Sequence, residues 1–290
     1  MDNEERKAIF IILFSTILGA ALAFVAADAT SSYSPIYTAV IAAYGIQWLA
    51  FIPAFILKTE RFYDLVGSLT YTSIVLYAVV VRPHLDIRSS VIAIFIIVWA
   101  LRLGSYLFLR VRRDRGDKRF ANVRQSFWRF LMAWTLQGLW VTFSLCAALA
   151  ALLSEREILP DIFFWNGAFL WFAGFSIEII ADNQKRKFRK EKNNIDKFIT
   201  TGMWAWSRHP NYFGEIVLWI GIAVLAFPVL EGWQLLTLIS PVFIFLLLTK
   251  GSGIPLLEAA ADKRWGDQTE YEKYKKSTSI LIPLPPRKKL

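Results

Sequence analysis

Long apolar runs recur along the 290-residue chain, separated by short polar segments. A helix that crosses the hydrocarbon core of a membrane needs about 20 mainly apolar residues. Segments of about this length lie at residues 8–27, 36–57, 62–81, 90–109, 130–153, 162–181, 212–227 and 234–249. The last two are short, and Pro228 and Gly232 separate them, which leaves a tight hairpin or a re-entrant pair as alternatives. The pattern predicts an all-α, polytopic transmembrane helical bundle of seven or eight spans.

The positive charges lie almost entirely on alternate connections between these runs. Of the 33 Lys and Arg, 29 fall in the N-terminus, the turn at 58–61, the loops 110–129 and 182–211, and the segment after residue 249. The other connections hold only Arg82, Arg88 and Arg156, and Arg102 lies inside a run. Cytoplasmic loops of membrane proteins carry the excess of Lys and Arg. Both termini are therefore predicted to be cytoplasmic, which requires an even number of spans and favours eight.

Composition agrees with this reading. The chain is 56% hydrophobic and 19% charged, against about 45–50% and about 25% in soluble domains. This apolar composition excludes a disordered chain. The net charge of +10 is concentrated in the loops between the spans, so it gives no reason to expect a nucleic-acid partner. The single cysteine, Cys146, excludes an intrachain disulfide. The first apolar run follows an acidic segment and lacks a small-residue cleavage pattern, so we expect a retained span.

Polar residues that recur every four positions mark the predicted cytoplasmic ends of several spans. Residues four apart share one face of a helix, and ionisable groups within spans are costly unless they are paired or hydrated. We call each set of polar residues spaced four apart a ladder. The ladders are Arg102, Tyr106 and Arg110; Glu178, Asp182 and Arg186; and Asn211 with Glu215. Gln137 is a further polar residue inside the fifth span. Any one pair could be a polar contact between helices. Three ladders at one membrane face favour a common polar cavity.

Two basic loops border that face. One contains Lys118 and Arg119, and the other contains Asn183 and Arg186 beside Asp182. Arg forks and Lys charges bind phosphates, so the loops suit a phosphorylated cofactor. The alternative is that these cations only set the topology and contact anionic lipid. The interleaved acidic and amide residues favour a cofactor pocket slightly.

The densest polar stretch is the segment 204–215, which places five hydrogen-bonding side chains within eight residues: Arg208, His209, Asn211, Tyr212 and Glu215. Pro210 suits the first turn of the following helix, because its missing N–H would be unpaired there. The free N–H groups of that turn form an anion site. No metal site is predicted, since the only other histidine, His84, lies on the opposite face. His209 is better suited to donate a hydrogen bond or a proton.

Motifs of soluble enzymes are missing. Gly251-Ser-Gly253 follows an apolar run and does not extend to a dinucleotide fingerprint, and no Gly-x-Ser-x-Gly elbow occurs. Cys146 has no candidate base nearby in the sequence. Acyl transfer through a covalent nucleophile is therefore disfavoured.

The segment 208–215, with Trp219-Ile-Gly221, resembles the signature of integral-membrane steroid 5α-reductases, sterol reductases and the related bacterial proteins grouped as DUF1295. The resemblance is closest to DUF1295 and spans roughly residues 60–285. It includes the segments 116–120, 136–138 and 253–258, Asp182-Asn183, and the spaced aromatic residues Trp265, Tyr271 and Tyr274. Isoprenylcysteine carboxyl methyltransferases and phospholipid methyltransferases are similar in the same region.

The resemblance implies a helical membrane enzyme that binds NADPH without a Rossmann domain. The reaction implied is hydride transfer to a polarised C=C bond of a lipid-like substrate, such as a steroid, sterol or isoprenoid enone. A bacterial inner membrane is favoured over the endoplasmic reticulum, with membrane lipids as further partners. Ladders, basic loops and matched motifs together predict these cofactor-binding residues: Arg102, Lys118, Arg119, Gln137, Asp182, Asn183, Arg186, Arg208, His209, Asn211, Tyr212, Glu215 and Glu258.

The catalytic positions depart from those of the steroid reductases. Alignment on Arg102 and Tyr106 puts Trp99 where the family's catalytic tyrosine stands, and Trp48 replaces the glutamate that follows a glutamine. An indole N–H donates a hydrogen bond but does not titrate. We therefore expect the proton donor among three other residues, namely Tyr106, Tyr71 and Asp64, or a substrate that is not a 3-keto steroid.

Two alternatives stay open. One is an S-adenosylmethionine-dependent methyltransferase acting on a lipid or a prenylated end, and the other is a non-enzymatic lipid-binding membrane protein. Basic loops favour a cofactor with several phosphates over the cationic sulfonium of S-adenosylmethionine. The expected organisation is one transmembrane domain, 1–290, with N-terminal spans 1–57, a reductase-like region 58–285 and a basic tail 286–290.

Overall fold

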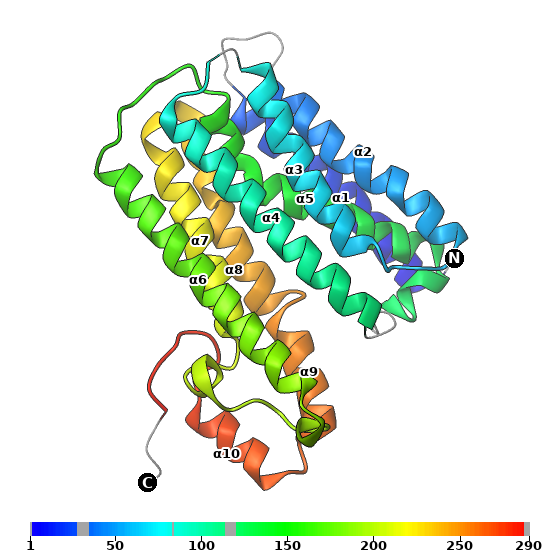
Figure 1. Ribbon diagram of the computed structural model, residues 1–290. Coiled ribbons are helices and arrows are strands. Elements are labelled where there is room, and N and C mark those ends of the chain that lie inside the picture. The colour runs from blue at the N-terminus through cyan, green and yellow to red at the C-terminus, as the bar shows by residue number, and fades with distance from the viewer. Residues whose placement is uncertain (1, 28–34, 83, 114–119, 287–290) are drawn as a thin grey trace. The chain divides into compact units, whose positions relative to one another are not determined.

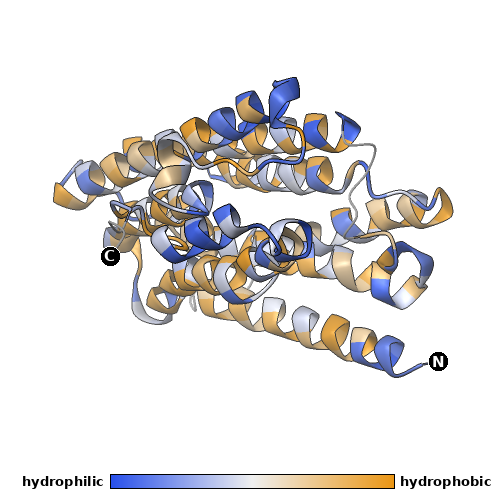
Figure 2. Cartoon of the chain, turned by 90° about the horizontal axis from the view of Figure 1, so that it is seen from below, coloured by the Kyte–Doolittle hydropathy of each residue, from blue (hydrophilic) through white to orange (hydrophobic). Residues whose placement is uncertain are grey.

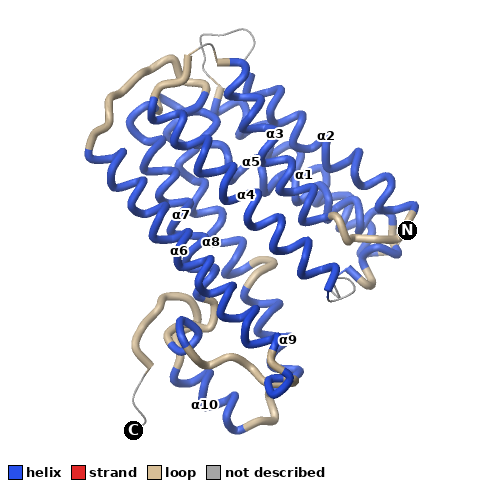
Figure 3. Tube along the Cα trace, viewed as in Figure 1, coloured by secondary structure: helices blue, strands red, loops and turns tan. Residues whose placement is uncertain are grey.

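The computed structural model describes residues 2–27, 35–82, 84–113 and 120–286 (Figures 1 and 3). These residues form helices joined by turns and loops, and the only β-type pairing among them is an isolated parallel bridge between Ser207 and Ser279. The α-helices are α1 (Asn3–Ala26), α2 (Pro35–Ile56), α3 (Tyr63–Val81), α4 (Ile87–Arg113), α5 (Phe127–Leu152), α6 (Ile162–Lys190), α7 (Pro210–Ala226), α8 (Ser240–Lys250), α9 (Ile254–Trp265) and α10 (Thr269–Ser277). The all-α prediction is confirmed for this part of the chain.

Eight helical segments in the described residues are long and apolar enough to span a membrane. They are Asn3–Ala26, Pro35–Ile56, Tyr63–Val81, Ile87–Arg113, Phe127–Leu152, Ile162–Lys190, Pro210–Val229 and Gly232–Trp265. Figure 2 shows hydrophobic residues along most of these helices and hydrophilic residues concentrated towards helix ends and connections. The protein is therefore an integral, multi-pass membrane protein. The cytoplasmic location of the termini stays a prediction.

The last two spans contain the irregular geometry that Pro228 and Gly232 indicate. α7 ends at Ala226 and is followed by the 3-10 helices η5 (Phe227–Val229) and η6 (Gly232–Ile239) before α8 begins. Pro228 lies in the first turn of η5, and Gly232 adopts a φ of 51°, which favours glycine. The final apolar segment continues through α8 into α9, so its length supports eight spans rather than seven.

The internal contacts of the chain define two compact units, residues 1–164 with 225–240, and residues 165–224 with 241–290. In the first unit α5 is the central helix. Of the 18 residues in its apolar stretch 83% are buried, against 28–39% of the corresponding stretches in α1 to α4. The buried run from Val141 to Leu152 is rich in Ala, with Ser144 and Cys146 in the same run. Small side chains let neighbouring helices approach closely in a membrane. The expected single domain and its boundaries stay predictions.

The three cations that interrupt the charge asymmetry all lie in this first unit, and each forms an ion pair: Arg82 with Asp86, Arg88 with Asp161 and Arg156 with Glu231. Arg88 is 1% exposed and donates to the carbonyl oxygen of Leu225 (3.0 Å), near the end of α7. Cations stabilise the carbonyl ends of helices. These arginines therefore have carboxylate partners within the protein.

Candidate functional site

In the second unit, α6 and α7 cross at glycines. A Cβ atom added to Gly174 on α6 would lie 2.5 Å from the carbonyl oxygen of Gly214 on α7, and a Cβ at Gly214 would lie 2.5 Å from the oxygen of Gly174. Two turns along, a Cβ at Gly221 would lie 2.7 Å from the oxygen of Gly167. The two backbones run antiparallel and touch, so no side chain larger than hydrogen fits at these positions.

This crossing sets the level of three buried carboxyl groups: Glu178 and Asp182 on α6, and Glu215 on α7, which are 2%, 4% and 6% exposed. The amide nitrogen of Glu178 lies opposite Gly214, 2.7 Å from a Cβ placed there. Because the helices are antiparallel and Asp182 is one turn beyond Glu178, Asp182 falls at the level of the first turn of α7. The structure therefore brings the ladders predicted on α6 and on α7 to one region.

The loop before α7 folds back onto α6. Trp204 donates its indole N–H to the carbonyl oxygen of Ala181 (3.0 Å), and the amide N–H of Met203 donates to Oε1 of Gln184 (2.9 Å). Nζ of Lys185 lies 4.3 Å from the centre of the Trp204 ring, a cation–π contact. These contacts hold against α6 the loop that leads to Arg208 and His209.

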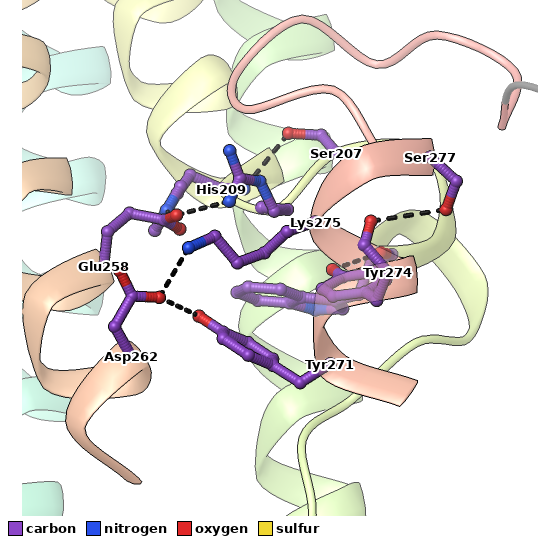
Figure 4. Close-up of polar contacts among 10 residues, drawn as sticks. Ser207, His209, Glu258, Asp262, Tyr271, Tyr274, Lys275 and Ser277 are labelled. Atoms are coloured by element: carbon purple, nitrogen blue, oxygen red, sulfur yellow. Dashed lines mark hydrogen bonds and ion pairs between the residues drawn. The ribbon is translucent and has the colours of Figure 1, made fainter. Parts of the chain in front are cut away.

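Arg208 and His209 both bind Glu258, which lies about fifty residues further along the chain on α9 (Figure 4). One carboxylate oxygen of Glu258 pairs with Nη1 of Arg208, and the other lies 2.8 Å from Nε2 of His209. All three side chains are less than one-fifth exposed. The guanidinium charge of Arg208 is therefore neutralised inside the protein by Glu258.

Burial fixes the protonation state of His209. It lowers the imidazole pKa, and the opposing effect of the hydrogen bond to Glu258 does not reverse the shift. A neutral imidazole has one donor and one acceptor nitrogen, and a carboxylate only accepts. Nε2 must therefore carry the proton, and Nδ1 is left as a buried acceptor that has no hydrogen-bond partner among the described residues. His209 can accept a donor at Nδ1, whereas its proton is held by Glu258.

A second polar group lies one turn along α9. Asp262 accepts hydrogen bonds from Nζ of Lys275 (2.7 Å) and from the hydroxyl of Tyr271 (3.0 Å), both on α10 (Figure 4). Burial and the bond to Asp262 raise the pKa of Tyr271. Tyr274 donates to the carbonyl oxygen of Trp204 (2.7 Å). α10 is thereby tied both to α9 and to the loop that carries Arg208 and His209.

The segment after α10, residues 278–286, is here called the C-terminal strap. It runs along the loop before α7 and is held by backbone and side-chain hydrogen bonds. The amide of Arg208 donates to the oxygen of Ser279 (2.8 Å), and the hydroxyl of Ser207 donates to the oxygen of Leu281 (2.7 Å). Ser207 is fully buried and also accepts the amide N–H of His209 (3.1 Å). The strap therefore fixes the chain at Arg208 and at the residue before it.

Ser207→Ala is expected to lower the free energy of unfolding by about 1–2 kcal/mol, because it leaves a buried N–H and a buried carbonyl without a partner. Thermal denaturation of the purified protein measures this loss. Ser277→Ala is the matched control, because its hydroxyl binds only the carbonyl of Tyr274 in the preceding turn (3.3 Å), and we expect a change within about 0.5 kcal/mol. Equal losses in the two variants would contradict a locking role for Ser207.

The other predicted cofactor residues of this unit lie around the same helix ends. Asn183 and Arg186 hydrogen-bond to each other at the end of α6 (3.0 Å), with Arg186 exposed. Asn211 and Tyr212 lie in the first turn of α7, and the ring of Tyr212 stacks on His209 at 5.8 Å between centroids. Lys118 and Arg119 fall outside the described residues.

The predicted catalytic residues lie in the first unit. Asp64 is 4.0 Å from Nη2 of Arg110, which pairs the start of α3 with the end of α4. Tyr71 is buried and donates its hydroxyl proton to Ser144 (2.9 Å). The ring of Tyr106 lies 5.5 Å from the guanidinium carbon of Arg102. In the described part of the chain, these contacts join the three candidates to three different residues, Arg110, Ser144 and Arg102.

Gln137 and the two tryptophans at the divergent positions also belong to the first unit. Gln137 donates its side-chain amide to the carbonyl oxygen of Tyr63 (3.2 Å). Trp48 donates its indole N–H to Thr135 (3.0 Å), and Trp99 packs edge-on against Tyr71 at 5.1 Å. These contacts are those of helix packing, and the indole of Trp48 is engaged with a neighbouring helix.

Sequence reasoning missed the residues that complete the cluster in the second unit: Ser207, Asp262, Tyr271 and Lys275. Asp262 lies four positions after Glu258, the spacing that marked the other ladders, so the signal was present. Tyr271 belongs to the spaced aromatic residues of the family resemblance, which assigns it no contact with Asp262. Among the described residues, no group of three or more His, Cys, Asp or Glu is arranged to hold a metal ion.

The fold and this cluster define a class: a polytopic helical membrane protein with a polar site at the ends of its C-terminal spans. A family model described as "Protein of unknown function (DUF1295)" matches residues 50–278. The match covers most of the chain, so the protein belongs to the DUF1295 family. No solved structure matches it.

Its curated relatives include steroid dehydrogenases. The chain is 30% identical over 125 residues to "3-oxo-5-alpha-steroid 4-dehydrogenase 1" of Bos taurus, covering 43% of each protein. It is 34% identical over 120 residues to the protein of the same name in Macaca fascicularis, covering 41% of this chain and 40% of the relative. It is 32% identical over 148 residues to "3-oxo-5-alpha-steroid 4-dehydrogenase 2" of Sus scrofa, covering 51% and 50%. The matches span about half the length of these relatives or less.

Proposed function

We propose that the protein is an NADPH-dependent membrane reductase that transfers hydride to a polarised C=C bond of a lipid-like substrate. The observation that carries the proposal is the buried carboxyl cluster at the crossing of α6 and α7, bordered by the basic end of α6. The similarity to steroid 4-dehydrogenases supports the same reaction class.

The buried carboxyl groups suit the uncharged half of the cofactor. The carboxylates of Asp182 and Glu215 are hydrogen-bond acceptors, and ribose hydroxyls and a nicotinamide carboxamide are donors. In the same unit, His209 has a buried acceptor, Nδ1, that has no hydrogen-bond partner among the described residues. Because a buried polar atom is costly unless it is hydrogen-bonded, a ligand with a hydrogen-bond donor would suit Nδ1 of His209.

The phosphates of the cofactor need cations, and the end of α6 supplies them. Arg186, Lys187 and Lys190 are exposed in its last turns. Arg208 is less suited than its position in the motif indicates, because Glu258 already pairs with its guanidinium. We therefore assign Arg208 to holding His209 and α9 in place, and the phosphate contacts to the exposed cations of α6.

The bound nicotinamide would supply the hydride. A proton must reach the reduced substrate from the protein, and Tyr71, Tyr106 and Asp64 stay the candidates for the donor. Tyr71 is the best shielded of the three from water, because its hydroxyl is buried and directed to Ser144. A lipid-like substrate is consistent with spans whose outer surfaces are apolar.

One observation favours a second candidate, an S-adenosylmethionine-dependent methyltransferase. Three buried carboxyl groups, Glu178, Asp182 and Glu215, would also stabilise a sulfonium cation. The two cofactors differ in charge, so direct comparison of their binding separates the two functions.

Thermal denaturation with NADPH, NADH or S-adenosylmethionine tests the proposal. Binding of NADPH at 100 times its dissociation constant is expected to add about 2.7 kcal/mol to the free energy of unfolding. A shift with S-adenosylmethionine and none with NADPH would identify the methyltransferase. Absence of a shift with all three ligands would favour a non-enzymatic lipid-binding protein.

Asp182→Asn and Glu215→Gln are expected to abolish most of the NADPH shift, because an amide replaces half of the acceptor capacity and removes the charge. The apo proteins should denature within a few degrees of the wild type. Asp196→Asn is the matched control, since Asp196 lies on the same unit with a side chain 76% exposed. If both variants respond to NADPH as the control does, the proposed pocket is wrong.

A further inference from the structure

The C-terminal strap has two unlike faces. Every second position of the strap is an exposed aliphatic residue: Ile280, Ile282 and Leu284 are 45%, 55% and 53% exposed. The residues next to them, Ser279 and Leu281, belong to the inner face. This alternation is that of an extended segment, in which successive side chains point to opposite sides. The inner side is held to the loop before α7 by the bonds of Ser279 and Leu281, so the apolar side chains are left on the outside.

Trp206 extends this apolar face. Its side chain is 48% exposed, and its carbonyl oxygen accepts the amide N–H of Leu284 (3.1 Å). Trp206 and the three aliphatic residues of the strap are called the strap patch below. Single exposed apolar residues are ordinary on protein surfaces, but a patch of four that includes a tryptophan indicates a binding surface.

The position of the strap patch identifies its partner. Trp206 precedes by four residues Pro210, where α7 and its membrane-spanning segment begin. The patch therefore lies close in the chain to the start of a membrane-spanning segment. Trp is enriched where spans enter the membrane, because its ring is apolar and its N–H is polar.

The charges beside the patch suit the same partner. Lys273 and Lys276 are exposed on α10, immediately before the strap. In the sequence Arg287, Lys288 and Lys289 follow it. When lysine and arginine flank apolar side chains, the cations bind anionic lipid headgroups, and the apolar side chains enter the boundary between the headgroups and the acyl chains.

We infer that the strap patch inserts into the headgroup region of the bilayer and anchors the C-terminal strap to the membrane surface. Because the inner face of the strap holds Ser207 and Arg208, the anchor fixes the loop that carries His209 at a constant depth. This inference does not depend on the nature of the cofactor.

Spin labelling of the full-length protein tests the anchor. In a Cys146→Ser background, Ile282→Cys is labelled with a nitroxide, and the protein is placed as single copies in nanodiscs that contain phosphatidylserine. Asp267→Cys is the control, since it is exposed in the turn between α9 and α10. The label at 282 should collide several times more often with oxygen, which concentrates in lipid, than with a water-soluble nickel chelate. The label at 267 should show the reverse order.

Two outcomes would overturn the inference. A label at 282 that is as accessible to the nickel chelate as the label at 267 means that the patch lies in water. A label that is immobile and shielded from both reagents means that the patch packs on protein. Leu284→Cys, the other end of the patch, provides an independent labelling site if the Ile282 variant is not obtained folded, and the same criteria apply to it.

Discussion

Gly214→Val is expected to prevent stable folding, with a loss of at least about 3 kcal/mol in the free energy of unfolding. A Cβ at this position would lie 2.5 Å from the oxygen of Gly174 and 2.7 Å from the amide nitrogen of Glu178. Both are backbone atoms within a helix, so neither can move without separating α6 from α7. Thermal denaturation and the yield of monodisperse protein in detergent measure the effect.

The chain contains a glycine that serves as a control for this prediction. Gly45 also lies within a helix, α2, and nothing lies within 4 Å of a Cβ added to it. Gly45→Ala is expected to be neutral or to stabilise by up to about 1 kcal/mol, the helix preference of alanine over glycine. A Gly214→Val protein as stable as the Gly45 variant would mean that α6 and α7 do not cross at these glycines. The placement of Glu178 opposite Gly214 would then lose its basis.

Glu258→Ala is expected to lower the free energy of unfolding by about 3 kcal/mol and to abolish the NADPH shift. Removing one partner of a buried ion pair costs about 3–5 kcal/mol, and partial exposure puts this site at the lower end. Arg208 and His209 lose their shared acceptor, and α9 loses its connection to the loop before α7. Denaturation with and without NADPH separates the structural loss from the loss of binding.

The control for this prediction is another arginine–carboxylate pair in the same unit. Arg264 and Asp196 form an ion pair with side chains 54% and 76% exposed, and Arg264→Ala is expected to cost less than about 1 kcal/mol. The NADPH shift should persist in it. If Glu258→Ala is as mild as Arg264→Ala, Glu258 does not hold the cluster together. If it is destabilised but keeps the full shift, Glu258 is structural and lies outside the cofactor site.

The spans could be predicted from the sequence because a membrane demands long apolar runs whatever their partners are. The eight predicted ranges match the eight helical segments, with differences at the ends. Those ends differ most where helices continue beyond the apolar run, as in α6, which extends to Lys190 and carries its basic residues on an added two turns. Apolarity marks the lipid-embedded part of such a helix, and charged residues with good helix propensity continue it into water.

The candidate site was predicted in its parts and not in its arrangement. Four-residue spacing places Asp182 or Glu215 on a helix face, because that relation is local. The same reasoning cannot join His209 to Glu258, since 49 positions separate them. It also presents Arg208 as a free cation, whereas the structure pairs it with Glu258. Partner choice depends on which helices are neighbours, and a single sequence does not encode that in any local pattern.

By itself the sequence determined that this is a helical, multi-pass membrane protein, how its positive charges are distributed between the spans, and which family it resembles. The length of an apolar run and the charge of a loop depend only on neighbouring residues, so both can be determined directly from the sequence. Only the tertiary structure decided that glycines bring α6 and α7 into backbone contact, that Glu258 neutralises Arg208, and that the C-terminal strap locks Ser207. These contacts join residues that are far apart in sequence, and they exist only once the helices have packed against one another.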